Sequence, residues 1–439
     1  MRTLNKFLPG TVCVLILCRA IAHGENATIS IKGVLDRAAA GPEVIAAQAQ
    51  ANAAGESSSA LWRATYAPKV GGVLAYSHMV EDQSVVLPSF GGILLPPMPV
   101  QSDMTLGTVQ ITQPLFDPAN MLYNTKAAQK KAEAARIRSS RQAKETQGTA
   151  IGYFLQILEL RSKRSALEIY RNNLKGRQNE ITRLYDLGAV SESDVLKIKL
   201  GIDDADQGIR EIALKEDYLA RMLAVVLGTD QVRTPEDLPD ELPNPTVRND
   251  LSDVNHLEKI HAMDAELESL KSAQSGLKAD YLPKVSAFAQ HSYTNSDLFN
   301  RSSFDTGGVL LSWSLFDGGV NLAKAKAVKH EHESLEQMRG LEAGSIQAGF
   351  RDAVNTLQTK RREYDERRAA VAEAKNVENI EFKRLKNGKS TVNNLIDAED
   401  TLKDRTEKAS LSRVNWYEAW FHLELAAGEP LSAPGSAMP

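Results

Sequence analysis

Three aspartates near the end of the chain have the spacing that most clearly suggests chemistry. Asp397, Asp400 and Asp404 stand at positions i, i+3 and i+7, which lie above one another on one face of a helix. We expect that face to lie opposite the apolar positions Leu395 and Leu402. In a symmetric assembly each aspartate becomes a ring of carboxylates, and such rings in a narrow passage favour cations and repel one another. The competing interpretation is the solvated acidic face of a coiled coil.

A second cluster, His330-Glu331-His332-Glu333, has the residue types of a metal site but not the spacing. Histidines two positions apart on a helix point away from each other, and a zinc-binding helix would need its second histidine at Ser334. The sequence also has no glycine-rich phosphate loop and no Gly-x-Ser-x-Gly nucleophile elbow. It therefore predicts no cofactor, no metal site and no enzymatic activity.

The first 22 residues have the features of an export signal. Basic residues precede an apolar run, residues 11–18, that is too short to cross a bilayer. Ala20-Ile21-Ala22 matches the pattern that signal peptidase recognises, so we expect cleavage after Ala22. The alternatives are an uncleaved anchor helix and lipidation of Cys13 or Cys18, and lipidation is disfavoured because large residues precede both cysteines.

Cleavage at this point would take the formal charge from −4 to −7, because Arg2, Lys6 and Arg19 leave with the signal. Both cysteines leave too, which excludes disulfides and thiol chemistry. An acidic mature chain argues against a nucleic-acid partner. No later stretch has the roughly 18 apolar residues of a membrane helix, so we expect a periplasmic protein, a secreted protein or an outer-membrane β-barrel.

The chain contains an internal repeat, in which landmarks of the first half recur in the second half. Leu115-Phe116-Asp117 recurs as Leu315-Phe316-Asp317, and Gly188 recurs as Gly388, both 200 residues later. Tyr66-Ala67-Pro68-Lys69-Val70 recurs 215 residues later, at residues 281–285, so the first half has 15 extra residues between these landmarks. A length difference in one segment beside none in the next is typical of a loop beside a rigid element.

In each half, the residue pattern predicts strands followed by long helices. Residues 108–115 and 308–315 alternate apolar with small or polar side chains, the period of a strand with one buried face. No proline occurs in residues 119–234 or 319–429, and apolar residues there repeat every seven positions, which indicates a coiled coil. Both helical stretches break at glycines 188 and 388, where Ser191 and Thr391 are placed to cap the returning helices. An outgoing arm of about 65 residues would span on the order of 100 Å.

These patterns divide the chain into five parts. Residues 1–22 form the signal peptide, 229–250 a proline-rich linker and 429–439 a flexible tail. The first repeat, 23–228, has strands at about 68–87 and 101–116 and a helical hairpin at 119–228. The second repeat, 251–428, has strands at about 283–296 and 302–316 and a hairpin at 319–427. The apolar loop 85–100 is expected either to plug a channel mouth or to fold against its rim.

Two strand pairs give four strands, too few to close a barrel. An open edge in lipid leaves backbone groups unpaired at a cost of several kcal/mol each, roughly. If these strands enter a membrane, several chains must therefore contribute to one barrel, because single-chain barrels begin at about eight strands. The helices are polar outside their seams and must project into water.

The sequence resembles the TolC-like outer-membrane efflux channels over about residues 29–428. The resemblance is carried by the two Tyr-x-Pro-Lys-Val segments, the two Leu-Phe-Asp segments and the two hairpin tips. The second tip, Arg384 to Gly388 followed by Leu395 to Ala398, is similar to the family's Arg-Tyr-x-x-Gly and Asp-Val-Leu-Asp-Ala pattern. The resemblance implies a homotrimer with a twelve-stranded β-barrel in the outer membrane and a twelve-helix periplasmic tunnel.

The resemblance also implies two functional sites. The family's pore-constriction aspartates fall on Asn394 and Asp397, and the asparagine puts a doubled acidic ring in doubt. The tips that dock onto a periplasmic adaptor are two four-residue segments, Gly188, Ala189, Val190 and Ser191 in the first hairpin and Gly388, Lys389, Ser390 and Thr391 in the second. Plain turn chemistry, glycine for positive φ and a hydroxyl for capping, is the alternative role of these residues.

The predicted function is a passive conduit that spans the periplasm and docks on an adaptor and an inner-membrane pump, for efflux or for type I secretion. The expected partners are two further copies of the chain, the adaptor, the pump and outer-membrane lipid. The alternative function is a periplasmic or secreted coiled-coil scaffold whose strands form a small soluble sandwich.

Overall fold

The computed structural model describes residues 28–78, 84–85, 98–99, 103–230, 234–239, 241–243, 254–295 and 302–432. The predicted signal peptide lies outside these residues, as do most of the loop 85–100 and of the tail 429–439 and part of the linker 229–250. The described ends of the loop pair with each other as the short strands β3 (Ser84–Val85) and β4 (Met98–Pro99).

The predicted unit, a strand pair followed by a long helical hairpin, is confirmed in both halves. The first half contains β2 (Lys69–His78), β5 (Asp103–Phe116), α3 (Thr125–Asp186) and α4 (Glu192–Val226). The second half contains β7 (Lys284–Thr294), β8 (Ser303–Ser312), α6 (Val320–Lys386) and α7 (Val392–Ala427). With 67 residues, α6 is about 100 Å long. A short π-helix, Ala119–Asn124, joins β5 to α3.

Shorter helices precede each strand pair. The first half begins with α1 (Ile31–Ala38) and α2 (Pro42–Tyr66), and the second with α5 (Glu258–Ala279). The break between α1 and α2 falls at Gly41-Pro42, because Gly41 is extended and proline is tolerated at the first position of a helix. The short parallel pair of β1 (Thr28–Ile29) and β6 (Thr234–Pro235) ties the beginning of the described chain to the linker.

The four long strands form one antiparallel sheet in the order β2-β5-β7-β8. The two strand pairs meet through β5 and β7, where Val109 lies opposite His291 and Gln110 opposite Gln290. Among the described residues, β2 and β8 are each paired on one side only. The sheet is therefore open, with a free edge contributed by each half.

The two faces of the sheet differ in chemistry. On one face most side chains are apolar and at least half exposed, or nearly so, among them Val70, Leu74, Val109, Ile111, Val309 and Leu311. The same face also carries two exposed histidine–aspartate pairs, His291 with Asp305 and His78 with Asp103. On the opposite face β5 and β7 present a row of polar side chains. Gln110 Nε2 donates to Thr112 Oγ1 (3.2 Å) and Gln290 Nε2 to Ser292 Oγ (2.7 Å). A soluble sheet exposes its polar face and buries its apolar one, so this exposed apolar face requires a different environment.

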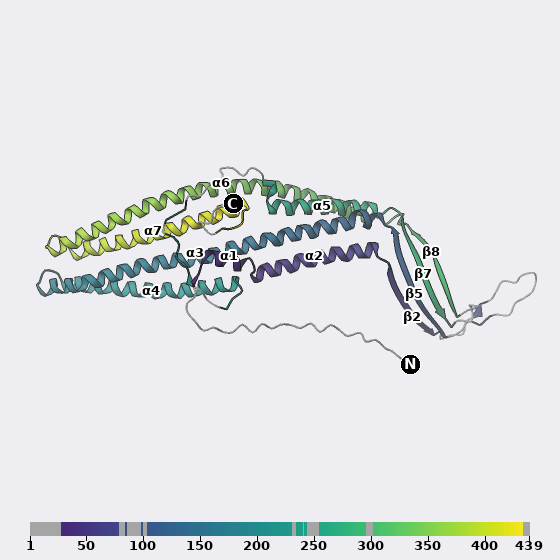
Figure 1. Cartoon of the computed structure of the whole chain (residues 1–439), viewed down its shortest axis with the longest axis horizontal. Coiled ribbons are helices and arrows are strands. Elements are labelled where there is room, and N and C mark those ends of the chain that lie inside the picture. The colour runs from purple at the N-terminus through teal and green to yellow at the C-terminus, as the bar shows by residue number, and fades with distance from the viewer. Residues whose placement is uncertain are drawn as a thin grey trace, which may run out of the picture.

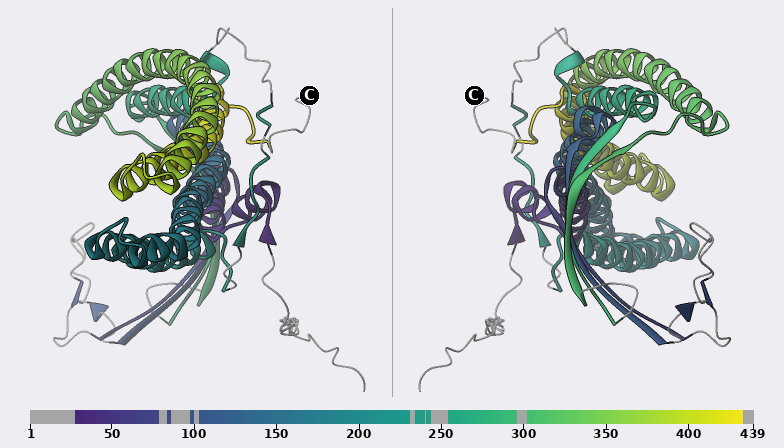
Figure 2. Two further views of the ribbon diagram at one scale, coloured as in Figure 1. Left: turned by 90° about the vertical axis from the view of Figure 1, so that its left-hand side faces the viewer. Right: turned by 90° about the vertical axis from the view of Figure 1, so that its right-hand side faces the viewer.

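The helices form one curved layer, with the sheet at one end and both hairpin tips at the other (Figure 1). Seen end-on, the layer is a C-shaped arc (Figure 2). Near the tips the order of contacting helices is α4, α3, α7 and α6, and near the sheet it is α2, α3, α5 and α6. The two hairpins therefore meet along α3 and α7.

The shorter helices continue the returning arms end to end. A Cβ built on Gly228, just after α4, would lie 3.0 Å from Cδ of Pro42, the first residue of α2. A Cβ built on Gly428, just after α7, would collide with the side chain of Leu257, just before α5. Both glycines also have positive φ, +62° and +72°, so only a residue without Cβ permits this close approach of two helix ends.

Two apolar clusters stabilise the layer. The larger cluster lies midway along the helices and includes Phe154, Trp416 and Tyr417, whose side chains are almost completely buried. The smaller cluster lies near the tips and contains predicted seam residues with no exposed surface, namely Leu174, Ile181, Ile198 and Leu395. The heptad seams thus pack each hairpin internally and also join it to its neighbour.

The duplicated tyrosines lie where strands join helices, and in the second half the tyrosine contacts the duplicated aspartate. Tyr281 Oη donates to Asp317 Oδ1 (2.7 Å), and the same carboxylate accepts from the backbone N–H of Asn321 (2.8 Å) at the start of α6. These hydrogen bonds, the Asn321 bond foremost, hold the pKa of Asp317 below its usual range. In the first half Tyr66 Oη donates instead to the carbonyl of Met121 (2.8 Å). The repeated motif therefore fixes the angle between sheet and helices.

Phe154→Ala should lower the free energy of unfolding by about 3–5 kcal/mol, because it leaves a cavity in the larger cluster. Gln156→Ala, at an exposed position on the same helix, should change it by less than about 0.5 kcal/mol. Urea unfolding of the detergent-solubilised protein, followed by circular dichroism, measures both values. Equal losses for the two variants would contradict the buried face assigned to α3.

Candidate functional site

The two hairpin tips have the same backbone geometry. Gly188 and Gly388 have φ of +70° and +66°. In the first tip the N–H of Gly188 bonds to the carbonyl of Tyr185 (2.8 Å) and that of Ala189 to the carbonyl of Leu184 (2.8 Å). The second tip repeats both bonds 200 residues later. This pattern is a Schellman motif, which satisfies the last carbonyls of the outgoing helix and requires a left-handed residue.

The predicted caps of the returning helices are confirmed. Ser191 and Asp194 form a capping box at the start of α4, in which the Asp194 carboxylate accepts from the Ser191 N–H (3.1 Å) and hydroxyl (2.7 Å). Thr391 Oγ1 accepts from the N–H of Asn394 (3.3 Å) at the start of α7. The hydroxyl of Ser191 is the main reason that the pKa of Asp194 is lowered.

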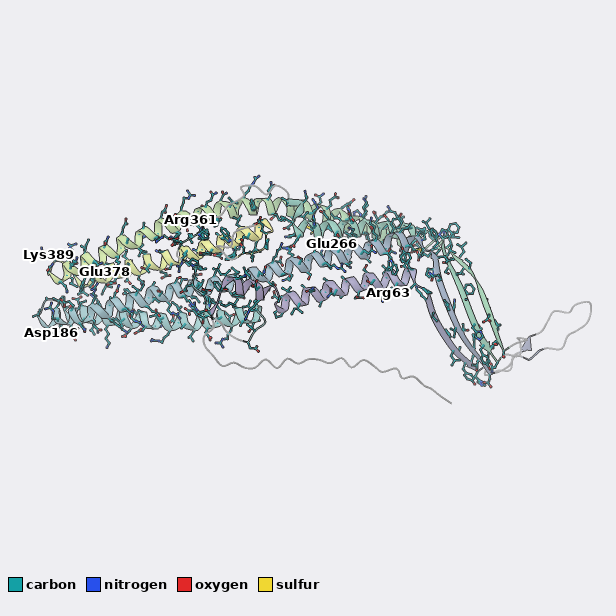
Figure 3. The ribbon with its side chains drawn as sticks, viewed as in Figure 1. Arg63, Asp186, Glu266, Arg361, Glu378 and Lys389 are labelled. Carbon is teal, nitrogen blue, oxygen red and sulfur yellow. The ribbon has the colours of Figure 1, made fainter. Side chains whose placement is uncertain are left out.

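The exposed ends of the tips differ in charge. Ser390 Oγ donates to Glu381 Oε2 (2.6 Å), and Arg384 Nη1 to Glu381 Oε1 (2.8 Å), so the second tip is a small polar network beside the exposed Lys389. Asp186 and Lys389 mark the two tips, which lie at the same end of the molecule (Figure 3). This end therefore presents two similar turns with different side chains to any partner.

The predicted pore-facing residues divide into two groups. The side chains of Asn394, Asp397 and Asp404 are exposed at the beginning of α7. Asn394 Nδ2 also donates to Ser390 Oγ (3.2 Å), which connects the tip to the first turn of the helix. Asp397 carries an exposed carboxylate next to the fully buried seam residue Leu395.

Asp400 is half-buried at the contact between α7 and α3. Its carboxylate pairs with Lys403 Nζ (3.0 Å), and it interacts with the hydroxyl of Tyr170. Lys403 Nζ lies 5.0 Å from the centre of the Tyr170 ring. Burial first, and then the charge of Asp400, raise the pKa of Tyr170. This aspartate therefore helps to join the two hairpins, and its place in a pore ring stays a prediction.

A buried polar cluster next to these residues was not predicted from the sequence. Arg177 of α3 donates through Nη2 to Glu378 Oε1 of α6 (2.6 Å), and Asn173 of α3 donates to Glu399 Oε2 of α7 (2.8 Å). Glu378 and Glu399 are 3% and 1% exposed. No periodicity distinguishes these glutamates from the many solvated ones, so only the contact of three helices reveals them.

The described residues offer no metal-ligating group of three or more side chains. His330 is exposed and contacts Glu333 of its own helix (3.1 Å from Nδ1 to Oε2). None of the described helices is both long enough and apolar enough to cross a membrane.

The fold is that of the TolC-like outer-membrane channels. The outer membrane protein VceC of Vibrio cholerae superposes with a TM-score of 0.77 at 15% identity, over 91% of this chain and 96% of that chain. The CmeC outer membrane channel of Campylobacter jejuni gives 0.75 at 12% identity, over 93% and 90%. The open state of the Neisseria gonorrhoeae MtrE channel gives 0.72 at 14% identity, over 91% and 89%. At sequence identities this low, the comparisons show that the folds are alike.

Sequence similarity agrees with the fold over part of the chain. Residues 256–429 match the family described as outer membrane efflux protein, and the first half repeats the architecture of this segment. No curated protein sequence matches the chain. The fold of the whole chain and the family matched by residues 256–429 therefore point to the same group of proteins.

Gly388→Ala should lower the free energy of unfolding by about 1–2 kcal/mol, because φ at this position is left-handed. Gly344→Ala is the matched control, because Gly344 lies within α6 with nothing within 4 Å of an added Cβ, and it should be stabilising by about 0.5–1 kcal/mol. Chemical denaturation of both variants measures the sign of each change in the free energy of unfolding. A stabilising Gly388→Ala would contradict the tip geometry.

Proposed function

We propose that the protein is one third of a homotrimeric outer-membrane channel that conducts cargo across the periplasm. Three copies would pool their four strands into a twelve-stranded barrel and their helices into a tunnel. The observation that carries this proposal is the open sheet, because its free edges, β2 and β8, could pair with the edges of neighbouring copies. Its exposed apolar face is suited to lipid, and its polar face to a water-filled passage.

The aromatic residues of the sheet support this orientation. Tyr76 and Tyr293 lie near the ends of the strands farthest from the helices and are at least half exposed. Trp313 and Phe316 lie at the opposite end, where the strands join the helices, and are more than half exposed. Two aromatic levels that flank an apolar band are typical of a barrel at the two interfaces of a membrane.

We infer that the tips point away from the membrane and dock onto a periplasmic adaptor bound to an inner-membrane pump. Two adjacent turns with the same backbone geometry give a trimer six similar docking points. The candidate docking residues are 188–191 and 388–391. The family description favours efflux over protein secretion as the process served. Export to the outer membrane would use the predicted signal peptide, residues 1–22.

Fractionation tests the proposal against the scaffold alternative. A trimer recovered from detergent-extracted outer membranes, stable enough to survive electrophoresis without heating, is the expected result. Full recovery of a monomer in the soluble periplasm would refute the channel.

Val109→Arg should greatly reduce the amount of trimer in the outer membrane, because arginine on the lipid face of a barrel costs about 2–4 kcal/mol near the midplane. Gln110→Arg is the matched control, one residue further along β5 on the opposite face, and should leave the amount of trimer nearly unchanged. Quantitative blotting of outer-membrane fractions compares them. Loss of trimer from Gln110→Arg alone would mean that the two faces are reversed.

Asp397→Asn and Asp397→Ala should both weaken block by multivalent cations in planar bilayers, because each removes a carboxylate from the proposed pore ring. Asp397→Ala should in addition enlarge the single-channel conductance, because its side chain is shorter. Unchanged block and conductance in both variants would remove Asp397 from the constriction without affecting the assignment of the barrel.

A further inference from the structure

The junction between the two hairpins contains an imbalance of buried charge. Glu378 of α6 and Glu399 of α7 are 3% and 1% exposed, and Arg177 of α3 is the cation between them. Arg177 Nη2 lies 2.6 Å from Glu378 Oε1, and its guanidinium carbon stacks 3.6 Å from the centre of the Phe382 ring. One guanidinium cannot balance two buried carboxylates, and an uncompensated buried charge is costly.

Protonation of the Glu399 carboxyl removes this imbalance of charge. Its Oε2 accepts from Asn173 Nδ2 (2.8 Å), but its Oε1 lies 3.8 Å from Arg177 Nε and has no hydrogen-bond partner in the described chain. Burial raises the pKa of Glu399 to about 7, against the opposing effect of the Asn173 bond and with a further contribution from the charge of Glu378. Near neutral pH Glu399 is therefore partly protonated, and protonation removes the negative charge that Arg177 leaves unbalanced.

The other charged groups of the junction are paired among themselves. On α7, Asp400 pairs with Lys403, which lies over the Tyr170 ring of α3. Nearer the tips, Lys386 of α6 lies 3.9 Å from Glu180 of α3. On α4, Lys197 donates to Asn393 of α7 (2.9 Å), and Asp206 pairs with Arg171 (3.0 Å) and Lys175 (3.5 Å) of α3. These pairs are partly exposed and do not supply a second cation to Glu399.

We propose that the proton on Glu399, buried beside Glu378 and Arg177, is a latch that holds the two hairpins together, and that losing it loosens the contact of α3 with α6 and α7 and lets the tips separate. The direction follows from linkage. A carboxyl that titrates near 7 when packed and near 4.5 when solvated favours the packed junction fully below about pH 4.5. Its contribution declines as the pH rises from there to about 7.

The latch would regulate the conduit, so its consequence for transport rests on the proposed function. The three helices belong to different hairpins, α3 to the first and α6 and α7 to the second. A change at their junction therefore changes the angle between the hairpins and the distance between their tips. Glu378 lies on the tip side of the molecule, where such a change has most effect (Figure 3).

Spin labels at the two tips measure the separation directly. Cysteines introduced as Ala189→Cys and Lys389→Cys would be the only ones in the mature chain if the predicted signal peptide, which contains Cys13 and Cys18, is cleaved. Labelled full-length protein in detergent, diluted with unlabelled copies, would be studied by pulsed electron resonance from about pH 5 to about pH 9. We expect the distance within one chain to lengthen or broaden with a midpoint near pH 7.

Two variants show which group is responsible. Glu399→Gln imitates the protonated acid and should keep the short distance at every pH. Glu373→Gln, at an exposed position on α6, should titrate like the unaltered protein. A distance in the unaltered protein that does not change with pH, or a Glu399→Gln variant that changes as much as the unaltered protein, would overturn the proposal. The distances need no conductance, so absence of channel activity would refute the proposed function and leave this test intact.

Discussion

In the proposed channel the sheet depends on one constraint: a backbone N–H or C=O inside a membrane has no water to bond with. A four-stranded open sheet with an exposed apolar face violates this constraint as a monomer, because its edge strands β2 and β8 have unpaired groups. The strand–helix junctions hold the sheet at a fixed angle, through Tyr281 and Asp317 in the second half. The sheet is therefore built as a segment of a wall, and every other element positions or extends that segment.

The helical part follows the same principle in water. Its helices form a single curved layer, so each hairpin buries its seam against its own partner arm and against the next hairpin. The larger apolar cluster lies midway along this layer, where α1 and the linker also contribute buried residues. Exposed apolar residues remain on the outer helices, among them Leu214 and Tyr218 on α4 and Leu341 on α6. In the proposed trimer, neighbouring copies would cover such residues.

Much of this organisation could be predicted from the sequence because it is periodic or duplicated. The 200-residue repeat identified both hairpins, and glycine and hydroxyl residues at the tips predicted the turns and caps that the structure has. The Glu378–Arg177–Glu399 cluster could not be predicted, because a glutamate buried by three helices from separate parts of the chain has the same local sequence pattern as a solvated one. Asp400 was grouped with Asp397 by helical spacing alone, but α7 has neighbours on two sides, and one of them, α3, contacts Asp400.

The end-to-end contacts at Gly228 and Gly428 have a consequence for how such proteins change during evolution. Each half contains a continuous rod made of two separate helices, and the two tips finish at the same level. Lengthening one of the four long helices by a few residues would shift its apolar seam relative to the seams of the other three helices. It would also move one hairpin tip out of level with the other. Viable insertions should therefore come in whole heptads and in all four arms together, whereas the strand-connecting loops can vary one at a time, as the 15 unmatched residues of the first half already do.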